Sequence, residues 1–333
     1  WWPPYFILEG PDQTRGWFYT LLVSGYIGFG MAPYKKVLMH GWSLDEQGRP
    51  MHKSLGNVIA PEEVFSRFSR DALRFYELQC TPWEDLKFSM KELEEVYKVL
   101  TIMWNVYYFA SLYMNLDSYS PEKYTLDSLS DYLQPEDLWL LSCFEFMVKK
   151  CNLSMEKFHI HELARAIRSF IVDDMSRWYI RLIRRRIWLE GEDKSKYAVY
   201  AVLYHVLLKL SAPIIPFITE KLYQSIFRVA DPSLPETIHL CDWPKPIEKF
   251  IDESLLKYMD LVRDIVETSY KIRQEKRLKL RYPLREIIVF TDDIDVIKSV
   301  ELFRGVLLDQ CNVKDLKIMP LSESSKYKVY EVF

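Results

Sequence analysis

Glycine divides this sequence into two parts with different architectures. Most of the ten glycines lie within residues 10–56, whereas residues 91–279 contain a single glycine, Gly191. Glycine permits turns and close backbone approaches but weakens helix interiors. The front of the chain is therefore expected to be rich in loops, and the long stretch behind it is expected to form helices.

The front part alternates strand-like and helix-like segments. Residues 5–8 and 36–40 are short apolar runs typical of strands, and residues 12–28 have the length of a helix. This alternation favours an α/β unit with a parallel sheet.

From residue 91 onward, large apolar residues recur at helical spacing, which predicts a helical bundle. The expected helices are residues 91–116, 135–151, 159–190, 195–229 and 253–279. The tail returns to β-like runs at residues 286–291 and 315–319, around a helix over residues 295–308. The sequence thus predicts a mainly α protein with an α/β front and a small α+β tail.

Composition excludes several classes of protein. The 333 residues are 49% hydrophobic and 15% aromatic, which excludes intrinsic disorder. A net charge of -3 excludes a uniformly basic surface, so any contact with a polyanion requires a local patch. No apolar run approaches the ~20 residues that a bilayer span needs. Five widely spaced cysteines argue against a zinc site and a disulfide framework, which favours the cytoplasm.

The first segment that carries chemistry runs from Glu9 to Phe18, where a strand is expected to end and a helix to begin. In open α/β sheets, ligands bind beyond the carboxyl ends of the strands. Gly10 would let a ligand approach the backbone, while Glu9, Asp12 and Gln13 offer groups suited to ribose hydroxyls or an ammonium. An acidic turn with Asp12 as a helix N-cap would explain the segment equally well.

The second segment is a loop that begins at His40 and Gly41 and continues to Asn57. It presents Lys53 beside Ser54 and small residues, and such a loop can hold phosphate, with the ammonium meeting the charge of a departing pyrophosphate. An ordinary surface loop would show the same composition.

The two segments together resemble the class I aminoacyl-tRNA synthetases, and within them the isoleucyl group of archaeal or eukaryotic-cytosolic type. Residues 9–18, EGPDQTRGWF, are similar to the G-x-D-Q-x-R-G-W-F segment of that group, and residues 51–54, MHKS, are similar to its KMSKS loop. Three later segments are similar to the family's anticodon-binding domain: residues 171–181, 210–222 and 238–244.

The resemblance implies a role for each matching residue. Trp17 would wall the pocket for the isoleucine side chain, and Lys53 would be the catalytic cation that stabilises the departing phosphates of ATP. Magnesium would accompany ATP, and no protein metal site is expected. The residues implied to bind ATP or the adenylate are Glu9, Gly10, Asp12, Gln13, His40, Gly41, Met51, Lys53 and Ser54.

The loop departs from the family pattern at two positions. Pro50 stands where lysine is usual, and His52 stands where serine is usual. One of two expected positive charges is thus absent, and His52 could replace it only when protonated. We therefore expect Lys53 to carry the function of the loop.

A row of arginines marks the best candidate for contacts with tRNA. On a helical wheel, Arg177, Arg181, Arg184 and Arg185 gather beside an apolar stripe formed by Ala164, Ile171, Met175, Trp178, Leu182 and Leu189. Arginines on a rigid helix suit phosphate contacts. A solvated face partly paired with Asp173 and Asp174 is the alternative.

The resemblance implies domains at residues 1–90 (second half of a Rossmann-type catalytic domain with its connecting segment), 91–245 (helical anticodon-binding domain) and 246–333 (helix and partial α+β domain). Its implied activity is the ATP-dependent ligation of isoleucine to tRNA(Ile) by a cytoplasmic enzyme that is monomeric at full length and has no membrane partner. We expect the chain to be a fragment without the HIGH motif and the editing insertion, and to form no adenylate alone. A valyl-type synthetase and a non-catalytic tRNA-binding module remain alternatives.

Overall fold

The computed structural model describes residues 2–188, 191, 193–206 and 208–326 of the chain, and these residues are mostly helical. They form two compact units. The first unit contains residues 1–107, 148–172 and 208–244, and the second contains residues 108–147, 173–207 and 245–333. The predicted boundaries at residues 90 and 245 stay predictions.

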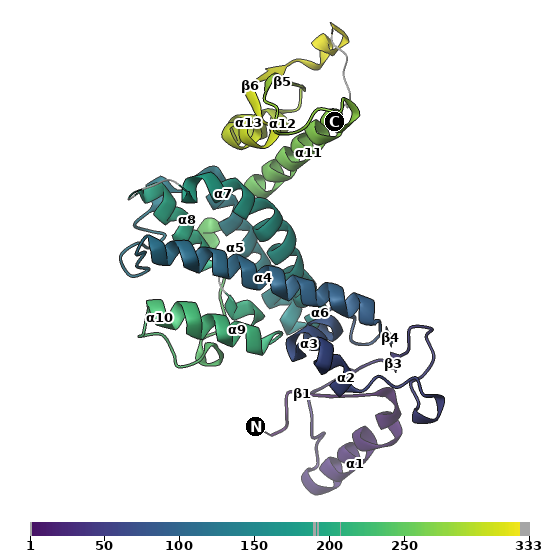
Figure 1. Ribbon diagram of the computed structural model, residues 1–333. Coiled ribbons are helices and arrows are strands. Elements are labelled where there is room, and N and C mark those ends of the chain that lie inside the picture. The colour runs from purple at the N-terminus through teal and green to yellow at the C-terminus, as the bar shows by residue number, and fades with distance from the viewer. Residues whose placement is uncertain (1, 189–190, 192, 207, 327–333) are drawn as a thin grey trace. The chain divides into compact units, whose positions relative to one another are not determined.

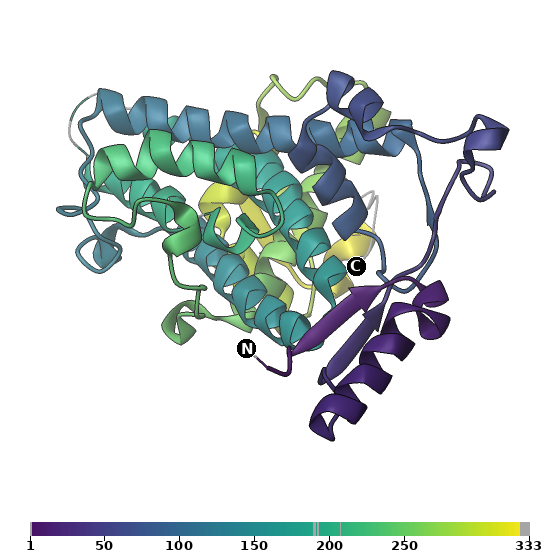
Figure 2. The same cartoon turned by 90° about the horizontal axis from the view of Figure 1, so that it is seen from below.

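The first unit begins with a strand–helix–strand arrangement, as the sequence predicts (Figure 2). Strands β1 (Phe6–Glu9) and β2 (Lys36–Met39) pair in parallel, and Ile7 lies opposite Val37. Helix α1 (Trp17–Phe29) connects them and ends at Gly30, whose φ of 69° is the left-handed conformation that favours glycine at a helix C-terminus.

Apolar side chains are exposed on both strands and on α1 of this front part. Leu8 on β1 is 46% exposed, Val37 on β2 is 46% exposed and Ile27 on α1 is 80% exposed. Leu8 and Val37 lie on opposite faces of the sheet, because Val37 is opposite Ile7 and side chains alternate along a strand. Strands of parallel sheets are normally covered on both faces, so these two side chains are more exposed than is usual in such a sheet.

The rest of the first unit is mainly helical. Its remaining elements are β3 (Ser43–Leu44), α2 (Pro61–Arg67), α3 (Arg70–Leu78), β4 (Leu86–Lys87), the first part of α4 (Met90–Leu116), the last part of α5 (Pro135–Glu156), α6 (Ile160–Ser169), α9 (Pro216–Leu222) and α10 (Arg228–Ala230). Strands β3 and β4 pair in parallel.

The single helix predicted over residues 195–229 is wrong. Helix α8 (Lys194–His205) ends well before Pro213, and α9 starts at Pro216. Proline lacks the backbone N–H that a helix interior needs and disfavours helical conformation in the residue before it. The free N–H groups at the start of α9 bind the carboxylate of Asp71, which accepts from Phe217 N at 3.3 Å and Ile218 N at 2.6 Å.

The predicted helix over residues 159–190 is observed as α6, a stretch with wider π-helical turns over Phe170–Tyr179, and α7 (Ile180–Ile187). The predicted apolar stripe is confirmed, since Ala164, Ile171, Met175, Trp178 and Leu182 are all buried. Leu189, its last member, lies outside the described residues.

The second unit holds a buried ionic cluster that the sequence did not reveal. The Arg186 guanidinium contacts both carboxylate oxygens of Asp137, at 3.0 and 2.8 Å, and Tyr179 donates to Asp137 at 2.7 Å. Burial raises the pKa of Tyr179 well above its usual value. Because a buried charge needs a partner, this arginine anchors α7 on α5.

The tail of the second unit is an α+β arrangement beside the long helix α11 (Glu253–Glu275) (Figure 1). Strands β5 (Leu284–Phe290) and β6 (Val313–Met319) pair in parallel. The helix predicted over residues 295–308 is instead two helices, α12 (Ile294–Leu302) and α13 (Arg304–Cys311). The break is at Phe303, which is buried and not helical.

The basic residue Arg273 in the last turn of α11 has a structural role. Arg273 is 3% exposed and donates to the main-chain oxygens of Tyr282 at 3.0 Å, Cys311 at 2.7 Å and Asn312 at 3.1 Å. It therefore joins the end of α11 to the segments that lead into β5 and β6.

Candidate active site

The carboxyl ends of β1 and β2 bring the first two predicted segments together. His40 N donates to Glu9 O at 3.1 Å. Gly10 is buried, and a Cβ at this position would lie 3.4 Å from His40 Cε1. Gly10 of the first segment and His40 of the second therefore lie side by side at the edge of the sheet where ligands bind in open α/β folds.

Gly41 is held tightly by a segment that sequence reasoning did not single out. Its N–H donates to Pro82 O at 2.9 Å, and a Cβ on Gly41 would lie 2.2 Å from Glu84 O. The next residue is held as well, since Trp42 N donates to an oxygen of the Asp85 carboxylate at 2.7 Å. Only glycine fits at this position.

Gln13 caps the start of α1. The alternative explanation of this segment, an acidic turn, expected Asp12 to be the cap. The Gln13 Oε1 atom accepts from Trp17 N at 2.6 Å, and Gln13 Nε2 donates to Asp12 Oδ2 at 3.0 Å. These contacts fix the start of α1 and leave the Trp17 indole 43% exposed. The segment thus presents an ordered carboxylate and an exposed aromatic side chain beside the strand ends.

The loop between β3 and α2 is organised by two residues that sequence reasoning missed. Buried Asp45 accepts from Arg49 N at 2.8 Å and from Asn57 Nδ2 at 2.9 Å. Asn57 also accepts from His52 N at 2.9 Å and donates to Pro50 O at 3.1 Å. The D-x-x-G turn at Asp45 was a usable signal, because aspartate often bonds the backbone of such turns.

These hydrogen bonds keep Asp45 ionised. The bond from Asn57 is the main cause that lowers the pKa of Asp45 to about 2. A lowered folded-state pKa adds stability that is complete above the ordinary value of 3.8 and is lost as pH falls through about 2. The Asp45 carboxylate, which organises the loop, therefore does not titrate near neutral pH.

His52 occupies the N-cap of the turn that carries Lys53 and Ser54. Its Nδ1 atom lies 2.8 Å from the Ser54 hydroxyl and accepts from Ser54 N at a longer 3.4 Å. Lys53 is the lysine of this turn, and it is exposed.

The loop and the strand ends are separate parts of the site. No hydrogen bond within the described residues joins Lys53 to the strand-end residues, and Figure 2 shows the loop, in dark blue, standing away from the ends of β1 and β2. The structure thus brings Glu9, Gly10 and His40 together but leaves Met51, Lys53 and Ser54 at a distance.

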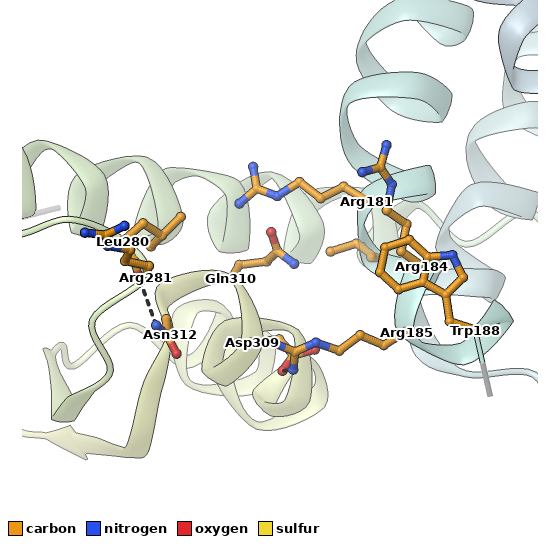
Figure 3. Close-up of a pocket in the computed structure, with 10 residues that line it drawn as sticks. Arg181, Arg184, Arg185, Trp188, Leu280, Arg281, Asp309, Gln310 and Asn312 are labelled. Carbon is orange, nitrogen blue, oxygen red and sulfur yellow. Dashed lines mark hydrogen bonds and ion pairs between the residues drawn. The ribbon is translucent and has the colours of Figure 1, made fainter. Parts of the chain in front are cut away.

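The predicted arginine row divides between a surface ion pair and a pocket. Arg177 pairs with Asp173 at 3.0 Å, in part as the alternative expected. Asp174 instead pairs with Arg263 of α11 at 2.9 Å. The three other arginines, Arg181, Arg184 and Arg185, line a pocket on the second unit (Figure 3).

Two further features are absent from the described part of the chain. No cluster of three or more His, Cys, Asp or Glu side chains there is placed to hold a metal ion. No helix in that part combines the length and the apolar character needed to cross a membrane.

Comparison with known proteins matches two families. Residues 1–89 match the tRNA synthetases class I (I, L, M and V), and residues 137–288 match the anticodon-binding domain of tRNA ligase. Among solved structures, the fold is similar to a LeuRS from Agrobacterium radiobacter in a ternary complex with tRNA and LeuAMS, with a TM-score of 0.57 and 18% identity over 75% of this chain and 29% of that one. A Mycobacterium tuberculosis methionyl-tRNA synthetase has a TM-score of 0.51 and 15% identity over 72% of this chain and 50% of that one.

The two family matches show that the chain belongs to the class I aminoacyl-tRNA synthetases. Its relatives within that class include the isoleucine–tRNA ligase of Methanosarcina mazei, 45% identical over 97% of this chain, and that of Pyrococcus abyssi, 46% identical over 95%. The chain spans about 31% and 30% of the length of these two relatives. It is thus homologous to a part of the archaeal isoleucine–tRNA ligases.

Proposed function

We propose that the protein containing these 333 residues activates isoleucine with ATP and transfers it to tRNA(Ile). The observation that carries this proposal is that Glu9 and Gly10 of the first segment meet His40 at the carboxyl ends of two parallel strands, in a chain about 45% identical to isoleucine–tRNA ligases. We also propose that the full-length enzyme is monomeric and cytoplasmic.

The strand-end residues would hold the adenylate. Glu9 and Asp12 are exposed carboxylates that suit ribose hydroxyls and the ammonium of the amino acid. The absence of a side chain at Gly10 lets the Asp12 carboxylate and the His40 ring lie close to the main chain there, since a Cβ would be 2.9 Å from Asp12 Oδ1 and 3.4 Å from His40 Cε1. The exposed Trp17 indole would form an apolar wall for the isoleucine side chain.

The chemistry needs no protein nucleophile. The isoleucine carboxylate attacks the α-phosphorus of ATP, one oxygen–phosphorus bond forms, and the bond to the departing pyrophosphate breaks. Catalysis then rests on positioning and on stabilising the negative charge of the phosphates. Lys53 supplies positive charge for that step, and Mg²⁺ would be held mainly by the phosphates of ATP.

The proposal is tested by pyrophosphate exchange. With the protein that contains these residues, isoleucine should support ATP–pyrophosphate exchange about 10–200-fold more efficiently than valine, because one methylene is worth roughly 1–3 kcal/mol. A reaction without amino acid is the blank. Faster exchange with valine would reject the isoleucine assignment in favour of a valyl-type enzyme.

The hydrogen bonds of Asn57 that organise the loop have a measurable role in this reaction. Asn57→Ala removes hydrogen bonds to Asp45, Pro50 and His52, so the turn that carries Lys53 should lose its position. We expect a roughly tenfold higher KM for ATP in the exchange assay, because each net hydrogen bond is worth about 1 kcal/mol.

Asn105→Ala is the matched control for this variant. Asn105 is exposed on α4, away from the loop, and its replacement should leave the KM for ATP unchanged. Equal values of the KM for ATP in both variants would show that the Asp45–Asn57 contacts do not organise the loop.

A further inference from the structure

We infer that Trp83 is a positioning residue for the site at the carboxyl ends of β1 and β2, the strand-end site. The start of α6 holds Trp83, and Trp83 holds the segment 82–85 against Gly41. This inference rests on the proposed function, because it takes the strand-end site to bind the adenylate. All of these residues lie in the first unit.

The segment 82–85 lies against the main chain that follows His40. Gly41 N donates to Pro82 O at 2.9 Å, and a Cβ on Gly41 would lie 2.2 Å from Glu84 O. Closely packed atoms transmit a displacement to their neighbours. A shift of this segment therefore moves Gly41, and His40 of the strand-end site moves with it.

Trp83, in the middle of this segment, packs against two histidines at the start of α6. Its ring centroid lies 5.4 Å from that of His161, with the two planes at 90°, and 5.5 Å from that of His159. Edge-to-face pairs at this separation are favourable for aromatic rings. Trp83 is 49% exposed, so it is held by contacts on one side only.

His161 presents a neutral ring to Trp83. It is 7% exposed, and its Nδ1 atom has no hydrogen-bond partner among the described residues. Burial lowers the pKa of His161, because a charged imidazole loses its hydration there. The contact between the two rings is therefore an aromatic one at neutral pH.

Helix α6 also holds the residues that lead into the segment 82–85. It packs beside α3 (Figure 1), and two of its arginines reach Gln79, the residue that follows α3. Arg165 Nε donates to Gln79 O at 2.8 Å, and Arg168 donates to Gln79 Oε1 at 3.0 Å. The chain is thus anchored to α6 twice, at Gln79 and at Trp83.

The corner that precedes α6 contacts the strands as well. Phe158 has a φ of 61°, a left-handed conformation that is rare for a bulky residue. Its ring centroid lies 5.0 Å from that of Phe6 on β1 and 5.1 Å from Lys36 Nζ on β2. Such strain persists where surrounding contacts determine it, and it is concentrated at functional sites. Residues 158–161 therefore support both the two strands and the segment 82–85.

Trp83→Ala is the first test, in ATP–pyrophosphate exchange by the protein that contains these residues. We expect the KM for ATP to rise roughly tenfold, because an aromatic edge contact is worth about a factor of ten in an equilibrium. The value of kcat should stay nearly unchanged, since a site that is ordered in fewer molecules binds more weakly but reacts normally once it is filled.

Two further variants show whether the aromatic contact is responsible. Trp83→Phe keeps a ring beside His161 and should restore most of the affinity for ATP. Trp104→Ala removes a tryptophan that is 38% exposed on α4 and should leave the KM for ATP unchanged.

The double variant of Trp83→Ala and His161→Ala tests whether the histidine acts through the tryptophan. Its KM for ATP should be no higher than that of Trp83→Ala alone, because residues in one contact do not contribute independently. Effects that multiply would contradict the role of α6 in holding Trp83.

Hydrogen exchange gives a measurement that does not depend on the reaction. The amide of Gly41 donates to Pro82 O, and that of Trp42 donates to the Asp85 carboxylate. Both should exchange about tenfold faster in Trp83→Ala, because the segment that accepts from them opens more often. The amides of β5, which belongs to the second unit, should exchange at the unaltered rate.

Four outcomes would overturn the inference. An unchanged KM for ATP in Trp83→Ala would reject the positioning role, and the proposed function would stand. Equal KM values in Trp83→Phe and Trp83→Ala would reject the aromatic contact. Faster exchange that extends to β5 would make Trp83 a residue of general stability. If the unaltered protein catalysed no isoleucine-dependent exchange, the proposed function would fail together with the inference.

Discussion

Lys53→Ala is expected to slow adenylate formation by about 10²–10³-fold, the typical effect of removing one group that stabilises charge in a transition state. Lys53 is the one lysine of the loop, because Pro50 stands where the family usually has a second lysine. The measurement is isoleucine-dependent ATP–pyrophosphate exchange with the protein that contains these residues.

Lys35→Ala is the control for this substitution. Lys35 is an exposed lysine of the same unit just before β2, at the end of the strand away from His40. Its replacement should leave the exchange rate unchanged. If both variants exchanged at the rate of the unaltered protein, the loop would have no catalytic role, and the non-catalytic tRNA-binding module would become the better interpretation.

Gly41→Ala is expected to lower the free energy of unfolding by about 1–3 kcal/mol, the usual cost of overpacking. The added Cβ would lie 2.2 Å from Glu84 O and 2.7 Å from Asp85 N, and both are main-chain atoms that can move only with the backbone. Because Gly41 follows His40, the same displacement should also disturb the strand-end site. Urea unfolding followed by circular dichroism measures the first effect.

Gly28→Ala is the matched control and should change stability in the opposite direction. Gly28 lies within α1, and a Cβ there meets no atom within 4 Å. Alanine in a helix interior is favoured over glycine by roughly 0.5–1 kcal/mol. Equal stability of the Gly28 and Gly41 variants would contradict the close contact between Gly41 and residues 84–85.

Sequence reasoning succeeded where the signal is local. The parallel pairing of residues 6–9 with 36–39 followed from the alternation of strand and helix, and the apolar stripe near Trp178 followed from helical periodicity. It failed at helix ends, as in the stretch over residues 195–229. Apolar residues continue across the break there, although Pro213 and Pro216 cannot lie inside one continuous helix.

The sequence by itself determined the class of protein, through the order and identity of the residues in its two signature segments. Only the tertiary structure decided how these residues are held. Gly41 meets Glu84, Asp45 meets Asn57, and Gln310 lines the same pocket as Arg184. Such contacts join positions far apart in the chain, and they depend on how whole elements pack, which no local pattern of residue types records.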